Sequence, residues 1–114
     1  MREVLADLAA IDGVEGSFLA GQDGLVVCAD GEAREGADLR AALIVAVFAT
    51  VERAISQLAV GEARYVTIDT STHTLHIAGF GDLLLVVIAE RRANPALIRW
   101  EIRRAARRLA EASA

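Results

Sequence analysis

The side chains best suited to chemistry in this sequence are two histidines and a single cysteine. His73 and His76 stand three residues apart in a predicted strand. Because side chains alternate across a strand, the two histidines face opposite sides and are poorly placed to share a metal ion. Cys28 stands in an apolar strand, where a packed and unreactive thiol is expected. These residues predict no metal site, no cofactor and no catalytic residue.

The glycines also lack the context of a catalytic loop. Gly13, Gly16, Gly21 and Gly24 are not followed by the Lys-Ser/Thr pair and the helix of a phosphate-binding loop. The Asp-Gly pairs at positions 12, 23 and 30 suit tight turns, which explains them by backbone geometry alone. No serine stands in a nucleophile elbow. The sequence therefore predicts a protein that is not an enzyme.

Arginines gather near the C-terminal end, around the single tryptophan. From Glu90 onward seven arginines face three acids, a charge of +4, whereas the rest carries five arginines and thirteen acids, a charge of −8. The acidic bulk of the chain should repel nucleic acid. On a predicted helix, Trp100 falls beside Arg103, Arg104 and Arg107. This arrangement fits a partner contact, a nucleic-acid contact, or a solvated helix with Trp100 packed on the first helix.

The 114 residues suffice for one small domain spanning 1–114, and 54% of them are hydrophobic but only 4% aromatic. This composition predicts an aliphatic core. No apolar run approaches the roughly 20 residues that span a bilayer. The N-terminal residues lack a secretory signal pattern. We therefore expect a cytoplasmic protein with no membrane span.

Hydrophobic periodicity and turn signals predict a regular order of elements. Asp38 is expected to cap the long helix, and Asn94-Pro95 is a strong start for the last one. The strand at 83–89 has no polar alternation and should be central and buried on both faces. The predicted fold is a five-stranded antiparallel sheet between the long helix on one face and the two terminal helices on the other. In order, the elements are a helix (2–10), a hairpin (14–20 and 25–29), a long helix (38–59), a three-stranded meander (64–70, 73–78 and 83–89) and a helix (95–112).

The long helix is apolar around most of its circumference. One face, expected to lie on the sheet, carries Leu43, Val47, Val51, Ala54 and Leu58, flanked by Ile44, Phe48 and Ile55. Alanines on the other face could simply be good helix formers in water. Val45 and the lack of any polar residue from 41 to 49 favour a protein–protein contact surface instead. The residues predicted to bind a partner are Ala42, Val45, Ala46, Ala49 and Arg53.

The strand at 64–70 offers a second contact. It begins the meander and could lie at the edge of the sheet, where an unpaired strand invites pairing with another chain. Val66 and Ile68 point to one side, and Tyr65 and Thr67 to the other. Pairing of two such edges would join two sheets into one and bring two long helices side by side.

The chain resembles the roadblock/dynein light chain family, and in particular its bacterial MglB-like members. The resemblance rests on Leu8 to Leu19 (LAAIDGVEGSFL) and Asp23 to Val27 (DGLVV), followed by the long alanine-rich helix, the meander and the final helix. It implies a homodimer or heterodimer with one continuous sheet and paired long helices, serving as a platform for a small Ras-like GTPase.

For MglB-like proteins, the resemblance implies that an MglA-type GTPase sits on the paired long helices and that its hydrolysis is stimulated. The corresponding surface here is Ala42, Ala46 and Ala49. Because such stimulation remodels the GTPase's own loops, Arg53 is not expected to be catalytic. Two alternatives stay open. One is binding of nucleic acid or another anionic surface by the arginine-rich last helix, and the other is a purely structural subunit of a signalling assembly.

Overall fold

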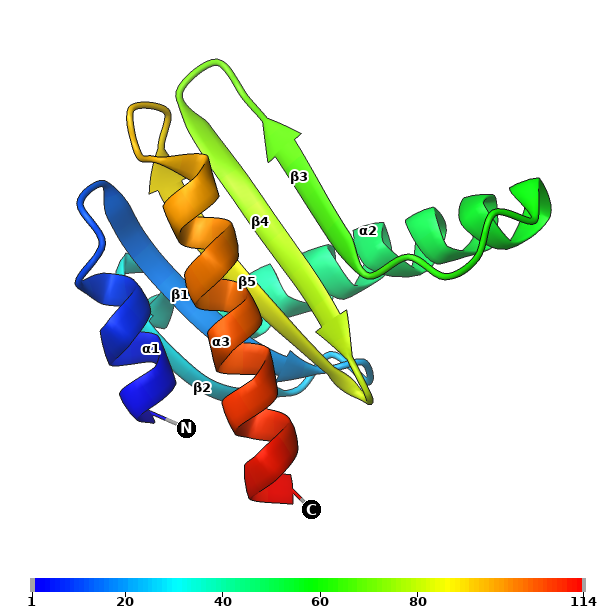
Figure 1. The fold of residues 1–114 in the computed structure, drawn as a ribbon, viewed down its shortest axis with the longest axis horizontal. Coiled ribbons are helices and arrows are strands. Elements are labelled where there is room, and N and C mark those ends of the chain that lie inside the picture. Colours follow the sequence, from blue (N-terminus) through cyan, green and yellow to red (C-terminus); the bar gives the residue numbers. More distant parts are fainter. Residues whose placement is uncertain (1, 114) are drawn as a thin grey trace.

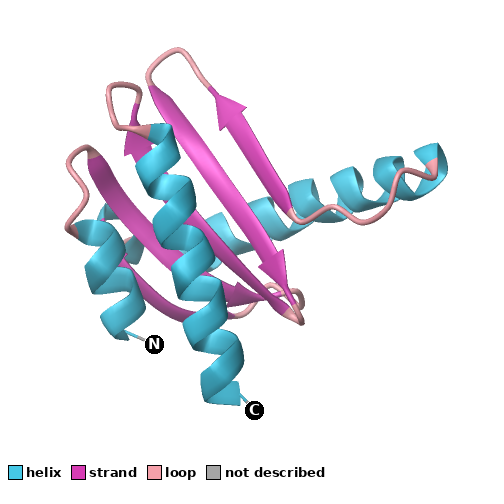
Figure 2. Ribbon diagram, viewed as in Figure 1, coloured by secondary structure: helices cyan, strands magenta, loops and turns pink. Residues whose placement is uncertain are grey.

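The chain folds around one antiparallel sheet, as a computed structural model that describes residues 2–113 shows (Figures 1 and 2). The elements are α1 (Arg2–Ala9), β1 (Val14–Gly21), β2 (Val26–Gly31), the short 3-10 helix η1 (Glu32–Arg34), α2 (Ala37–Leu58), β3 (Tyr65–Asp69), β4 (His73–Phe80), β5 (Leu83–Glu90) and α3 (Pro95–Ser113). The strand order is β2-β1-β5-β4-β3, so β2 and β3 form the edges. Helices α1 and α3 cover one face and α2 lies on the other, which confirms the predicted fold.

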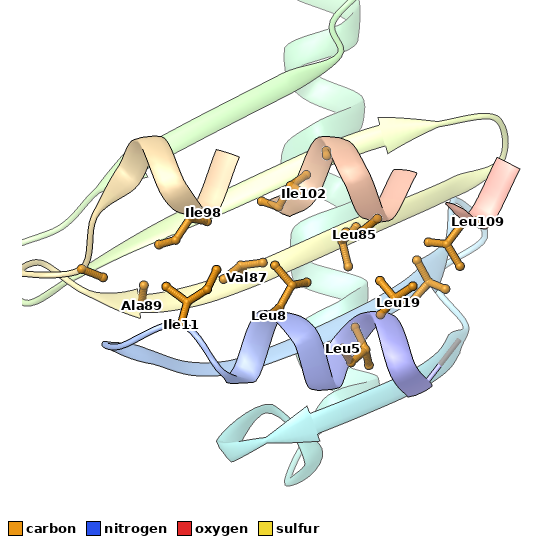
Figure 3. Packing of buried hydrophobic residues seen from close by; sticks show 14 residues of the cluster. Leu5, Leu8, Ile11, Leu19, Leu85, Val87, Ala89, Ile98, Ile102 and Leu109 are labelled. Atoms are coloured by element: carbon orange, nitrogen blue, oxygen red, sulfur yellow. The ribbon is translucent and has the colours of Figure 1, made fainter. Parts of the chain in front are cut away.

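A hydrophobic core lies on each face of the sheet, and β5 contributes to both. Leu85 and Val87 pack under α1 and α3, whereas Leu84 and Val86 pack under α2. All four side chains are at most 1% exposed. Figure 3 shows the first core, in which side chains from α1 and α3 meet over β5. The prediction of a central strand buried on both faces is confirmed.

The two long helices begin in different ways. The Asn94 Oδ1 atom accepts hydrogen bonds from the backbone N–H groups of Ala96 (3.0 Å) and Leu97 (3.2 Å), as predicted from the Asn-Pro pair. The predicted cap at Asp38 is wrong. Helix α2 already begins at Ala37, after Gly36 in the left-handed region (φ 67°), and no side chain caps it. Asp38 lies in the first turn, where its negative charge stabilises the helix by interacting with the positive end of the helix dipole.

Helix α2 is covered by the sheet along only part of its length. It contacts β1, β2 and η1, and Figure 1 shows its C-terminal end reaching past the edge strand β3. The expectation that no apolar run is long enough to span a bilayer is wrong for α2, which has the length and composition to cross a membrane, and only 11% of its most apolar stretch is buried. One side of the helix nevertheless packs in the core. A large apolar surface of α2 is therefore left uncovered by the rest of the described chain.

Candidate interaction surfaces

The rotation of α2 is set by Ala41 and Phe48, its only buried residues. The Phe48 ring lies on the bare backbone of Gly79 in β4, where an added Cβ would come within 2.7 Å of the ring's Cζ atom. Ile44 and Val45 pack, partly buried, against the same core. The expectation that Val45 belongs to the outward face is therefore wrong.

The face of α2 that was expected on the sheet turns outward instead. Leu43, Val47 and Leu58 are 58%, 38% and 67% exposed, and Leu39 is 67% exposed. We call these four residues the leucine stripe. The expectation was wrong because a helix that is apolar around its circumference presents no single apolar face from which its rotation could be read.

A second open face of α2 carries small side chains. Ala42, Ala46 and Arg53 are exposed and Ala49 is half-buried; we call these four residues the alanine face. Thr50 Oγ1 donates to the carbonyl oxygen of Ala46 (2.9 Å) and accepts from Arg53 Nη2 (3.3 Å), so the guanidinium lies back along the helix. With only methyl groups and a folded-back arginine, this face allows another protein to approach the helix closely.

Beside the leucine stripe, the sheet face under α2 is partly open. A hollow of about 210 Å³ lies between Leu43 on the helix and Leu75 and Ile88 on the sheet. It continues into a hollow of about 340 Å³, in which Leu75 and Ile88 are joined by His73 and Glu15. The two hollows form one groove with an apolar floor and a helix wall.

Strand β3 lies at the sheet edge, as predicted. Within the described chain it pairs only with β4, where Thr67 stands opposite His76. Val66 and Ile68 pack toward the α2 core and Tyr65 toward the other core, so the predicted alternation is confirmed. An open edge of this kind offers backbone N–H and C=O groups to another strand.

Above β3, on the α3 side of the sheet, Tyr65 joins His76 and Arg99. The Tyr65 hydroxyl lies 2.6 Å from His76 Nδ1, and the Arg99 guanidinium carbon lies 4.5 Å from the centre of the tyrosine ring. His76 is 2% exposed. Burial lowers its pKa against the opposing effect of Asp69, and burial also raises the pKa of Tyr65. His76 is therefore neutral at pH 7.

The two histidines face opposite sides of the sheet, as predicted. His73 lines the groove beneath α2, with Nε2 2.5 Å from Glu15 Oε1 and Nδ1 2.7 Å from Thr72 Oγ1. Among residues 2–113, no group of three or more His, Cys, Asp or Glu side chains could hold a metal ion. Cys28 is partly buried against the core, and burial raises the pKa of its thiol, which fits the packed thiol that was predicted.

The arginine-rich helix α3 presents Trp100 to solvent. Trp100 is 53% exposed, with the Arg104 guanidinium carbon 5.0 Å from the ring centre, and Arg107 is exposed. Helix α3 meets α1 on its other side, where Arg108 Nη1 lies 2.5 Å from Asp7 Oδ2. The interpretation that Trp100 packs on the first helix is therefore wrong, and its side chain is open to a partner.

The sheet with one helix on one face and two on the other defines a roadblock-type, profilin-like fold. Within the described residues, the edge strand β3 and much of the long helix α2 are left open to other molecules. Residues 1–89 match the Roadblock/LC7 domain, and the chain belongs to this family.

Similar proteins extend this finding over nearly the whole chain. An uncharacterized protein of Methanocaldococcus jannaschii is 32% identical over 103 residues, which cover 90% of this chain and 87% of that protein. The structure of a Roadblock/LC7 domain from Streptomyces avermitilis superposes with a TM-score of 0.90 at 21% identity, covering 97% of this chain and 95% of that one. Myxococcus xanthus MglB superposes with a TM-score of 0.88 at 19% identity, covering 97% and 94%. The fold is thus shared with MglB.

Proposed function

We propose that this protein is a non-catalytic, homodimeric platform in the cytoplasm that binds a small Ras-like GTPase, with residues 1–114 acting as one domain. The observation that carries the proposal is the surface of α2, which is apolar around its circumference although only Ala41 and Phe48 are buried. Leaving apolar surface in water costs about 25 cal/mol per Å² relative to burying it. The leucine stripe and the alanine face point in different directions, which favours two separate contacts.

The leucine stripe and the adjacent groove suit a second copy of the chain. Helix α2 reaches past β3, and beside this helix Leu75 and Ile88 of the sheet line an open hollow. If two β3 edges pair, the overhanging end of each α2 lies over the open groove of the other protomer. Both copies then bury apolar surface that neither can bury alone, and the two sheets become one.

The alanine face suits the GTPase. In such a dimer it remains on the outer side of the paired helices, where methyl groups let a globular partner approach the helix backbone. The fold shared with MglB and membership of the Roadblock/LC7 family support this assignment. The GTPase would keep its own catalytic residues, because Arg53 lies back along α2 toward Thr50. Binding on this face is compatible with stimulated hydrolysis and with scaffolding of the GTPase alone.

The platform is tested by placing a charge on the alanine face. Ala46→Arg and Ala49→Arg should each abolish binding of the Ras-like GTPase whose gene lies nearest in the same genome, loaded with a non-hydrolysable GTP analogue. The long arginine side chain keeps the partner from the helix, while both variants stay folded and dimeric. Binding is measured by titration calorimetry.

The matched control is Ala110→Arg on the exposed side of α3, which should bind the GTPase like the wild type. Wild-type affinity in both alanine-face variants would show that the GTPase does not use this face.

A further inference from the structure

The cluster of Tyr65 and Arg99 carries a positive charge that no acid balances. Arg99 stacks on the Tyr65 ring and makes no ion pair within residues 2–113, and Arg103 stands one turn further along α3. A hollow of about 300 Å³ opens beside Tyr65, Thr67 and Arg99 at the edge of the sheet. The place is therefore suited to an anionic group arriving from beyond β3.

The same strand holds a carboxylate without an ion-pair partner. Asp69 is exposed at the end of β3 and makes no ion pair within the described residues. Side chains alternate along β3, so Tyr65, Thr67 and Asp69 face the α3 side, while Val66 and Ile68 face the α2 side. Arg99 and Asp69 thus lie on the same face of the sheet but near opposite ends of the strand.

The dimer proposed above fixes how two β3 strands could pair. Both α2 helices must lie on the same face of the joined sheet. Residues on the α2 side of one β3 therefore oppose residues on the α2 side of the other, and residues on the α3 side oppose residues on the α3 side. All five residues of β3 are paired only when Thr67 stands opposite Thr67 of the partner subunit. In this register Tyr65 opposes the partner subunit's Asp69, and Val66 opposes the partner subunit's Ile68.

We infer that the partner subunit's Asp69 completes the Tyr65–Arg99 cluster and forms an ion pair with Arg99 across the dimer interface. This inference rests on the proposed dimer. Directly opposed side chains on antiparallel strands have Cβ atoms about 4.5–5.5 Å apart. The partner subunit's carboxylate thus lies beside the Tyr65 ring, and the Arg99 guanidinium already lies 4.5 Å from the centre of that ring.

Two-fold symmetry makes the contact occur twice in each dimer. It also selects the register, because a shift of two residues removes either Tyr65 or Asp69 from the paired stretch. A shift of four residues in one direction places the two Asp69 carboxylates opposite each other, where like charges repel. The apolar pairs on the α2 face therefore supply binding energy, and the ion pairs on the α3 face set the alignment.

The test uses two charge reversals, Arg99→Glu and Asp69→Arg. Each variant alone places two like-charged contacts in its homodimer, so the dissociation constant of the dimer should rise by roughly tenfold or more.

A mixture of the two variants forms a heterodimer with two attractive pairs. In one pair the glutamate introduced at position 99 faces the arginine introduced at position 69 of the other chain, and the second pair is the native Arg99 with the native Asp69. The mixture should therefore dimerise about as tightly as the wild type. Both positions are exposed, so each monomer stays folded.

Sedimentation velocity of each variant and of the mixture, with one chain fluorescently labelled, separates the outcomes. Arg107→Glu and Asp82→Arg serve as controls that reverse charges of the same type elsewhere and should dimerise like the wild type. A wild-type dimer whose affinity is unchanged in both variants, with no preference for heterodimers, overturns the ion pair and leaves the dimer standing. A monomeric wild-type protein overturns the dimer itself.

Discussion

At the scale of single residues, one glycine decides how the longest helix sits on the sheet. The Phe48 ring occupies the space that a side chain at position 79 would need. With Phe48 in this place, Ala41 also faces inward and the leucine stripe faces outward. The directions of the leucine stripe and of the alanine face thus depend on a contact with one residue of β4 that has no Cβ.

Substitution of Gly79 by valine should destabilise the protein by about 1–3 kcal/mol, since the added side chain overpacks the core against Phe48. The free energy of unfolding is measured by urea titration. The double variant Gly79→Val/Phe48→Leu provides the control, because the smaller leucine side chain at position 48 makes room for the valine. Its loss should be smaller than the sum of the two single losses, and strict additivity would contradict the contact.

His76 should make stability depend on pH. Burial lowers the pKa of His76 in the folded state, so the folded state favours the neutral side chain. The stability that depends on this neutral form is fully present above the unfolded-state pKa of about 6.5. It is lost as the pH falls below that value, because the unfolded chain then binds a proton that the folded one excludes. Urea unfolding at pH 7.5, 6.5 and 5.5 should show a steeper decline for the wild type than for His76→Gln.

Equal slopes for the wild type and His76→Gln would show that burial of His76 does not oppose its protonation.

At the scale of elements, the two long helices differ in how well their sequences define them. Helix α3 has its own start signal, and the Asn94 side chain caps two backbone N–H groups. Helix α2 starts after a left-handed Gly36 and ends before Ala59, which also adopts a left-handed conformation (φ 56°). Helix α3 is therefore fixed largely by local signals, and α2 by what it packs against.

Removal of the α3 cap should have a measurable cost. Asn94→Ala is expected to lower the free energy of unfolding by about 1 kcal/mol, since two N–H groups at the helix start lose their acceptor. Asn94→Asp keeps an acceptor oxygen at the same position and should retain most of the stability in the same urea titration. Equal stability of the alanine variant and the wild type would show that the cap contributes nothing.

At the scale of the whole molecule, the uncovered surfaces lie together on the side of α2 and at the β3 edge. The chain buries a core on each face of the sheet, yet leaves Leu39, Leu43 and Leu58 more than half exposed. In a monomer the leucine stripe and the groove beside it both stay exposed to water, which is unfavourable for apolar surface. Two copies joined at β3 would cover these surfaces and would leave the alanine face for a third protein.

A charge in the leucine stripe should therefore separate the protomers. Leu43→Glu is expected to convert the dimer into a folded monomer, because the carboxylate would be buried against the partner helix without a counter-charge. Size-exclusion chromatography with light scattering at micromolar concentration measures the mass. Leu97→Glu, at a similarly exposed leucine of α3, should remain dimeric. A dimeric Leu43→Glu protein would place the interface elsewhere.

The sequence by itself determined the order of the elements, the antiparallel sheet, the central place of β5 and the edge position of β3. These features follow from local signals: alternation of side chains, an unbroken apolar run, Asp-Gly turns and the Asn-Pro pair. Of the residues predicted on the outer side of α2, Val45 packs on the core, and the other four form the alanine face.

Only the tertiary structure decided which side of α2 meets the sheet, because apolar residues surround that helix and several rotations bury similar surface. The contact of Phe48 with Gly79 selects one of them. The meeting of Tyr65, His76 and Arg99 was likewise beyond the sequence, since it joins three elements through strand register and the placement of α3. Local patterns fix elements, whereas the fit between distant side chains fixes the surfaces that the protein presents.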